Sequence, residues 1–349
     1  MKHYTFEGLR CIFMLAIFCG HLEVYKIPFF QGIGAALGGN LAVTFFFILA
    51  GYVAELSFIR KPEQASSYLS WIGKKIWRFY PLHIVTMLCA LPFLFLNPTH
   101  DTFNLVKIIT ANVLLIKSLI PSSDYYFSLN GVSWFLCTWL LLTAVSPCLH
   151  TFIKDKHKYA LLLFVLIRII ISTLAYYIDL LPWFTYISPW FRIFDYLIGM
   201  LIAKRYIENN DLPLLKKTWI STLLEIFCIL LPIIQIQFCI IKLEIVNFAI
   251  ALGIFLTFLQ EKGMVSKTIR YNYIARLGGY TYIFYLLHQL VIEYVYIAHT
   301  RFFPHKTIAI VASLIISVTG TYIIHKILTF LNNYSKKHED STSHLSRLP

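Results

Sequence analysis

Long, uninterrupted runs of apolar residues are the feature that most restricts how this chain can fold. LLLFVLIRIIISTLAYYI and IAIVASLIISVTGTYII are two of them. A run of about 18 or more apolar residues is long enough to cross the hydrocarbon core of a bilayer as a helix. Only 13% of the residues are charged, whereas about 25% is usual in a soluble globular domain. The sequence therefore predicts an all-α, polytopic integral membrane protein.

Hydropathy divides the chain into ten predicted membrane spans. The segments between them are too short to bury a core of their own, so a single membrane domain is expected to fill residues 1–331. The remaining segment, 332–349, is polar and has the composition of a disordered cytoplasmic tail. The predicted spans are 6–25, 36–58, 79–96, 132–152, 158–178, 186–204, 218–238, 241–259, 277–299 and 306–331.

Lysine and arginine are unevenly distributed between the two sides of this arrangement. With the N-terminus in the cytoplasm, 22 of the 30 Lys and Arg residues fall in inner segments and 6 in outer segments. Such an excess is typical of cytoplasmic loops, so both termini are predicted to be cytoplasmic. The excess of basic residues in the cytoplasmic segments also explains the net charge of +13, so nucleic-acid binding is not needed to explain it. The long segment 97–131 then lies outside, and its short apolar middle favours a re-entrant or interfacial helix.

The seven cysteines carry no signature of chemistry. They form no CxxC pair, and most lie inside apolar runs. Cysteine in such surroundings packs as a small hydrophobic residue. We therefore expect neither a disulfide framework nor a metal site.

Ionisable residues inside spans are the first candidates for function, because a bilayer makes them costly without a partner, water or substrate. Arg10 and His21 share the first span. Their spacing of about three helical turns places them on nearly the same face, roughly 16 Å apart, with His21 toward the outer side. The alternative reading of His21 is a hydrogen-bonded histidine near a helix end, with Glu23 close by.

A basic turn precedes the third span. In GKKIWRFYPLH, Lys74, Lys75 and Arg78 lie at the predicted cytoplasmic entrance of the helix. One interpretation is topogenic charge, with side chains that snorkel to the interface. The other is a clamp for a phosphate or another anion, which three cations on one turn and a forked guanidinium suit.

Three later spans also contain ionisable groups. Arg192 and Asp195 are three residues apart and can pair along one helix face, either as a structural pair or as a substrate contact. Arg168 has no partner nearby in the sequence and is expected to face the bundle interior. His288 follows Tyr285 by three residues, so the two can share a hydrogen bond, and a structural role is favoured for His288.

Several segments, taken in order, resemble acyltransferase family 3, the membrane acyltransferases of surface polysaccharides and related acceptors. GLRCIFMLAIFCGH resembles the opening motif, an arginine followed after ten residues by a histidine. AVTFFFILAGYV resembles the phenylalanine-rich second helix ending in a small residue and glycine, here Ala50 and Gly51. KKIWRFYPLHIV resembles the basic turn before Tyr-Pro, and NGVSWFLCTWLLLTAVSP, with Trp134, the fourth helix. SPWFRIFDYLIGM and RLGGYTYIFYLLHQLV resemble later motifs.

The resemblance implies a ten-helix protein of the bacterial cytoplasmic membrane that takes an acyl group from cytoplasmic acyl-CoA and delivers it to an acceptor on the other side. It implies that His21 is the essential histidine, with Arg10 on the same helix. It also implies that Arg78 and Lys75, with Lys74 beside them, lie near the acyl-CoA. Lys75 stands where the family has arginine, which keeps the charge but loses the forked geometry.

The expected activity is transfer of an acyl group, expected to be acetyl, to a hydroxyl of a surface polysaccharide or its lipid-linked precursor. We expect no bound cofactor, acetyl-CoA as the donor substrate, and membrane lipid and a glycan as partners. His21 suits general-base catalysis because its pKa is ordinarily near neutrality, and a covalent acyl-histidine relay stays open. Two alternatives remain: a transporter or flippase of a lipid-linked glycan, and a non-catalytic scaffold of a polysaccharide assembly complex.

Overall fold

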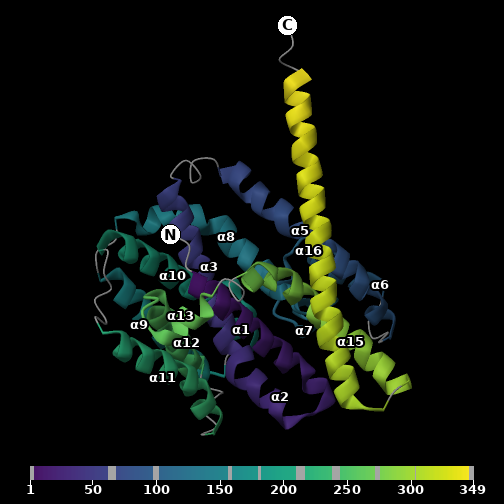
Figure 1. The fold of residues 1–349 in the computed structure, drawn as a ribbon, viewed down its shortest axis with the longest axis horizontal. Coiled ribbons are helices and arrows are strands. Elements are labelled where there is room, and N and C mark those ends of the chain that lie inside the picture. Colours follow the sequence, from purple (N-terminus) through teal and green to yellow (C-terminus); the bar gives the residue numbers. More distant parts are fainter. Residues whose placement is uncertain are drawn as a thin grey trace.

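The computed structural model is helical throughout the residues that it describes, with no strand among them. Figure 1 shows long helices packed side by side and joined by short helices and loops. The all-α, polytopic fold class predicted from the apolar runs is confirmed. The described residues are 4–61, 68–96, 102–155, 159–179, 182–209, 217–237, 244–271, 276–302 and 304–345.

Ten long helices take the positions of the ten predicted spans, in the same order. Their ends differ from the predicted ends by up to 14 residues, the largest difference being at the end of α16, where the helix continues beyond the apolar run. The ten are α1 (Tyr4–His21), α3 (Asn40–Arg60), α5 (Tyr68–Leu96), α8 (Ser133–Lys154), α9 (Ala160–Tyr177), α10 (Pro189–Asn209), α11 (Thr218–Gln237), α12 (Glu244–Leu259), α15 (Thr281–Phe302) and α16 (Lys306–Leu345).

By length and composition, eight helical segments in the described ranges can cross a membrane. α10 and α12 are outside this group, because α10 contains several charged residues and α12 has 16 residues. Both are surrounded by other helices. α10 packs against α3, α8 and α9, and α12 packs against α3, α9 and α11. These protein neighbours shield the two helices from lipid, so a short or charged helix is tolerated there.

Short helices fill the segment between α5 and α8, for which the sequence predicts a helix too short to be a span. The buried Lys117 ammonium donates 3.0 Å hydrogen bonds to the carbonyl oxygens of Ser128 and Asn130, which ties this segment to the start of α8. The short helices are α6 (Thr102–Val113), η3 (Lys117–Leu119) and α7 (Ser123–Tyr126).

Single turns of helix make up most of the other described connections. In Figure 1, α15 and α16 lie side by side at the lower right, and α16 extends from there to the top of the view. The short elements are η1 (Leu22–Tyr25), α2 (Pro28–Ile33), η2 (Gly34–Gly38), η4 (Trp183–Ile187), α13 (Met264–Ile269) and η6 (Gly278–Tyr280).

The last helix, α16, extends beyond the end of the predicted membrane domain. α16 continues through the polar residues after 331 and ends at Leu345. Adding a residue to an existing helix gains one hydrogen bond for each residue that is fixed, so a long apolar helix can extend into a polar segment. The division of the chain at residue 331 and the disorder expected after it remain predictions.

α3 and α10 cross at very short range because each has a glycine at the contact. A Cβ added at Gly51 would come within 3.0 Å of three backbone atoms of Tyr196, and one at Gly199 would meet the backbone at Ile48 and Tyr52. Small residues permit such approaches between membrane helices. This contact gives Gly51, a residue of the second-helix motif, a packing role.

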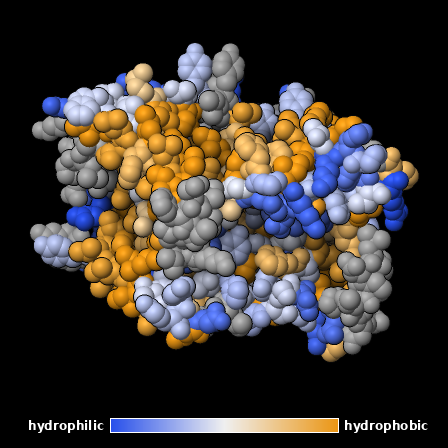
Figure 2. All heavy atoms as spheres, turned by 90° about the horizontal axis from the view of Figure 1, so that it is seen from below, coloured by the Kyte–Doolittle hydropathy of each residue, from blue (hydrophilic) through white to orange (hydrophobic). Residues whose placement is uncertain are grey.

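The surface carries many large apolar side chains on peripheral helices. Figure 2 shows broad apolar areas beside groups of hydrophilic side chains. α9 exposes Leu162, Leu163 and Ile170. Apolar side chains at this density on the outside are typical of helices that face lipid.

Candidate functional site

One face of α1 borders a large cavity of about 1620 Å³. The lining residues from this helix are Glu7, Arg10, Met14, Ile17 and His21. Their spacings alternate between three and four residues, which is the repeat of one helix face. The prediction that Arg10 and His21 share a face is therefore confirmed, and the cavity extends along most of α1.

The end of the cavity near Arg10 is basic. Lys74, Lys75 and Arg78 of α5 line it together with Arg10. Arg10 forms a 3.3 Å ion pair with Glu7 on its own helix. Within the described ranges, no carboxylate comes within ion-pair distance of the three α5 cations. Four cations against one carboxylate leave this mouth positively charged.

Lys75 and Arg78 are partly held by aromatic rings. The Lys75 ammonium is 5.5 Å from the ring centre of Trp71, and the Arg78 guanidinium is 5.5 Å from that of Phe79. Such contacts orient a cation but leave its hydrogen-bond donors free. The side chains of Lys74 and Arg78 are exposed, which suits contact with an anion that arrives from solution.

Aromatic side chains also line the cavity. Four of them are Trp71, Phe79, Trp139 and Tyr282, and Trp71 and Phe79 contact cations of the basic mouth. Trp134 lies further along and is buried, with its ring 5.0 Å from that of Tyr186. A passage of this composition is suited to a long, largely uncharged chain.

At the other end, His21 is the last residue of α1 and is half-buried at the cavity wall. Glu23, Gly131, Val132 and Gln289 also line this part. The structure thus brings His21, Arg10, Lys74, Lys75, Arg78, Trp134 and Tyr285, all selected from the sequence, onto one cavity.

The loop before α8 is fastened to α15, which fixes this end of the cavity. The Tyr285 hydroxyl donates a 2.7 Å hydrogen bond to the carbonyl of Val132, and the Val132 N–H donates one of 3.0 Å to Gln289 Oε1. The Asn130 amide donates a 2.9 Å bond to the carbonyl of Leu286. The Tyr285 hydroxyl is therefore occupied by the loop. His288 bonds to the backbone carbonyl of Tyr285 at 2.7 Å, so the expected partnership is made through the main chain.

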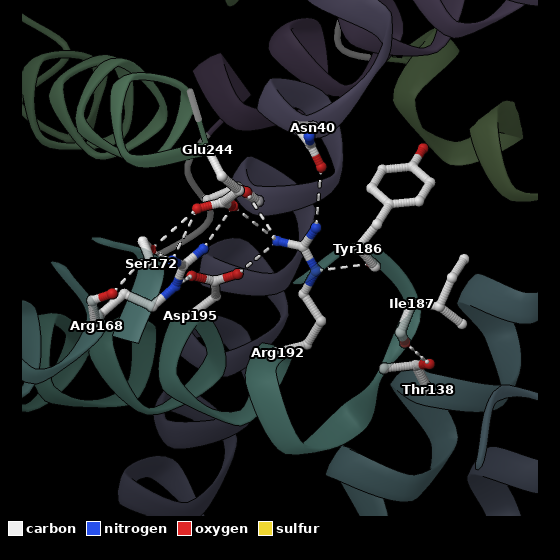
Figure 3. Close-up of polar contacts among 10 residues, drawn as sticks. Asn40, Thr138, Arg168, Ser172, Tyr186, Ile187, Arg192, Asp195 and Glu244 are labelled. Carbon is white, nitrogen blue, oxygen red and sulfur yellow. Dashed lines mark hydrogen bonds and ion pairs between the residues drawn. The ribbon is translucent and has the colours of Figure 1, made fainter. Parts of the chain in front are cut away.

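Arg192 and Asp195 form the predicted ion pair, at 2.9 Å between Nη1 and Oδ2. Both are fully buried, and neither lines the large cavity. Figure 3 shows the two as part of a larger network that includes Arg168 and Glu244. The positions of these residues favour the structural reading of the pair over the substrate contact.

This network reaches the cavity indirectly. Arg192 Nε donates a 3.0 Å hydrogen bond to the carbonyl of Tyr186, whose ring lines the cavity. Arg192 also donates to Thr44 and Asn40 of α3, at 3.0 and 3.3 Å. The buried charges therefore hold η4 and α3 together behind the cavity wall (Figure 3).

A second, smaller cavity of about 380 Å³ shares Tyr186 with the large one. Asn40 and Asn247 line it, together with Pro182 and Thr185. Sequence reasoning singled out none of these residues. Asn and Thr are common in loops and helices, so only their positions around the second cavity identify them as candidate site residues.

Two carboxylates near these sites, Glu7 and Glu244, were likewise not predicted from the sequence. Glu7 had a usable signal, since it lies three residues before Arg10 on the same helix. Glu244 had none, because its partner Arg168 is 76 residues away in the chain.

Comparison with known proteins gives a consistent result. The sequence profile of acyltransferase family 3, described as an acyltransferase domain, matches residues 3–326. Acyltransferase MdmB of Streptomyces mycarofaciens is 29% identical over 139 residues, which are 38% of this chain and 35% of that protein. The similarity therefore spans about a third of that relative. No solved structure matches the chain. The profile covers nearly all of the described helices and the residues that line the cavity, and the chain therefore belongs to acyltransferase family 3.

Proposed function

We propose that the protein transfers an acyl group, acetyl in the simplest case, from cytoplasmic acyl-CoA to a hydroxyl of a surface polysaccharide or of its lipid-linked precursor. The observation that carries the proposal is the single cavity that joins Arg10, Lys75 and Arg78 at one end to His21 at the other. Positive charge at the predicted cytoplasmic mouth and a histidine deeper inside match the two ends of an acyl-CoA molecule.

The basic mouth suits the nucleotide part of acyl-CoA. Phosphate groups carry negative charge and acceptor oxygens, for which lysine and arginine are the favoured partners. The exposed side chains of Lys74 and Arg78 can reach a nucleotide in the cytoplasm. The half-buried Arg10 and Lys75 lie next to them on the cavity wall.

The length of α1 suits the pantetheine arm. Arg10 and His21 are separated by about 16 Å along the helix, at a rise of about 1.5 Å per residue. The aromatic wall that includes Phe79, Trp139 and Tyr282 borders the space between them. An extended pantetheine arm with its phosphates at the mouth would bring the thioester to the level of His21.

His21 is assigned as the general base. A ring nitrogen takes the proton of the acceptor hydroxyl while the hydroxyl oxygen attacks the thioester carbonyl. A carbon–oxygen ester bond forms, the carbon–sulfur bond breaks, and the CoA thiolate leaves. The imidazolium proton then returns to the thiolate or to water, so that the products are an O-acyl ester and CoA.

The second cavity offers a place for the acceptor. Its asparagine and tyrosine side chains, Asn40, Asn247 and Tyr186, belong to the types that hydrogen-bond and stack on sugars. Because Tyr186 borders both cavities, an acceptor there would lie beside the chamber that contains His21.

The experiment compares the surface polysaccharide of a strain that carries the gene with that of its deletion. The expected result is the loss of one O-acyl ester by nuclear magnetic resonance, with the sugar backbone unchanged, and its return on complementation. A polysaccharide that stops reaching the surface with its esters intact would instead favour the transporter or flippase.

A further inference from the structure

His288 has a hydrogen-bonding arrangement that the proposed mechanism has not yet used. Its side chain is completely buried in α15. Nδ1 lies 3.1 Å from the carbonyl oxygen of Phe284 and 2.7 Å from that of Tyr285. Nε2 is buried too, and it has no hydrogen-bond partner among the described protein atoms.

These contacts assign the tautomer of His288. A carbonyl oxygen only accepts hydrogen bonds, so Nδ1 must carry the hydrogen. In the neutral ring, Nε2 then carries a lone pair and can only accept. The backbone of α15 thus fixes a histidine whose free nitrogen requires a donor.

Among the described rings that contact the ring of His288, that of His21 is the closest by its centre. The centres of the two imidazole rings are 5.1 Å apart. The rings of Phe284 and Phe18, at 5.7 and 6.3 Å, have no donor to offer. Tyr285, at 5.8 Å, already donates its hydroxyl to Val132.

His21 is able to turn toward His288. It ends α1 and borders the open cavity, so its ring has space that the ring of His288 lacks. At a centre-to-centre distance of 5.1 Å, rotation of the His21 ring can bring one of its nitrogens within hydrogen-bonding distance of Nε2.

We propose that His288 is a positioning residue for His21: its Nε2 accepts a hydrogen bond from the N–H of His21 and so directs the other, unprotonated nitrogen of His21 into the cavity. This inference rests on the proposed function. Catalytic bases are commonly oriented by a third group in this way. Once His21 has taken the hydroxyl proton, the same bond stabilises the imidazolium.

A pair of amide variants tests the proposal. His288→Gln places an amide oxygen near the position of Nε2, whereas His288→Asn keeps a donor near Nδ1 and leaves the Nε2 position empty. The measured quantities are kcat and KM for acetyl-CoA, obtained with the full chain in membranes that contain the acceptor glycan. Thermal unfolding midpoints of the purified variants check that both fold.

We expect His288→Gln to keep kcat within about threefold of wild type, while His288→Asn loses about tenfold or more with KM for acetyl-CoA unchanged. His83 is the matched control, since it is also buried, bonds a backbone carbonyl and has a free ring nitrogen, but lies away from the cavity lining. His83→Gln and His83→Asn should have the same kcat.

Equal kcat values in the two His288 variants would overturn the positioning role, whether both are active or both inactive. A failure of the proposed function itself is distinguishable, because wild-type protein would then show no transfer that depends on acetyl-CoA.

Discussion

Arg168 and Glu244 are 76 residues apart in the chain and form a two-pronged ion pair inside the bundle, at 2.9 Å from Nη1 to Oε2 and 2.7 Å from Nη2 to Oε1. Arg168 Nε also donates a 2.8 Å bond to Asp195, which is shared with Arg192. Two arginines and two carboxylates thus balance one another where α9, α10 and α12 meet (Figure 3).

Removing one charge from this network should destabilise the protein. Glu244→Gln leaves two buried arginines with a single carboxylate, and breaking a buried pair from one side typically costs about 3–5 kcal/mol. The thermal unfolding midpoint in detergent should fall clearly. Glu208→Gln is the control, because the pair of Glu208 with Lys204 is 3.8 Å long and its carboxylate is 56% exposed. Equal midpoints for the two variants would contradict a stabilising network.

The contact between α3 and α10 predicts a sharp difference between two glycines. Gly51→Ala should lower expression or thermal stability, because the new Cβ would overlap the backbone at Tyr196. Gly253→Ala in α12 should be neutral or slightly stabilising, because nothing lies within 4 Å of an added Cβ there and alanine favours helix. The comparison uses fluorescence-detected size exclusion across a temperature series. Similar curves for both variants would mean that the close contact between α3 and α10 does not contribute to thermal stability.

These two features show where sequence reasoning succeeds and where it ends. The ten helices could be predicted because the backbone of an apolar run in lipid must satisfy its own hydrogen bonds, which a helix does. Arg192 and Asp195 could be paired because a helix repeats every 3.6 residues. The partnership of Arg168 with Glu244, and that of His288 with His21, could not, because both depend on how separate helices pack. The large cavity could not be predicted from the sequence either, although seven of the candidate site residues line it.

The basic mouth predicts a defect in donor binding. Arg78→Ala should raise KM for acetyl-CoA roughly ten- to a hundred-fold, since a charge-assisted contact is worth about 1.5–3 kcal/mol. Arg78→Lys should lose less, because it keeps the charge. Lys267→Ala, which removes an exposed cation from α13 outside the cavity lining, serves as the control and should leave KM unchanged. A KM for acetyl-CoA equal to that of wild type in Arg78→Ala would show that Arg78 does not contribute to binding of the donor.

The distribution of basic residues predicts the orientation in the membrane. In a cysteine-free background, Ser123→Cys in α7 should react with an impermeant maleimide added to whole cells. Lys267→Cys in α13 should react only after the membrane is opened. Both side chains are exposed in the structure, so burial does not confuse the comparison. Equal labelling of the two positions from outside would contradict the predicted topology.

The proposed role of His21 is to remove the proton of the acceptor hydroxyl, and one rate tests this role. The measurement is the initial rate of transfer of labelled acetyl from acetyl-CoA to the glycan in membranes, at matched protein level, for wild type and His21→Gln. General-base catalysis is commonly worth about 10² to 10⁴ in rate, and an amide can hydrogen-bond but cannot take a proton at neutral pH. We expect His21→Gln to lose at least about 10² in rate, while His83→Gln stays near wild type. A His21→Gln rate close to that of wild type would show that the histidine only packs or hydrogen-bonds, and would contradict its role as the general base.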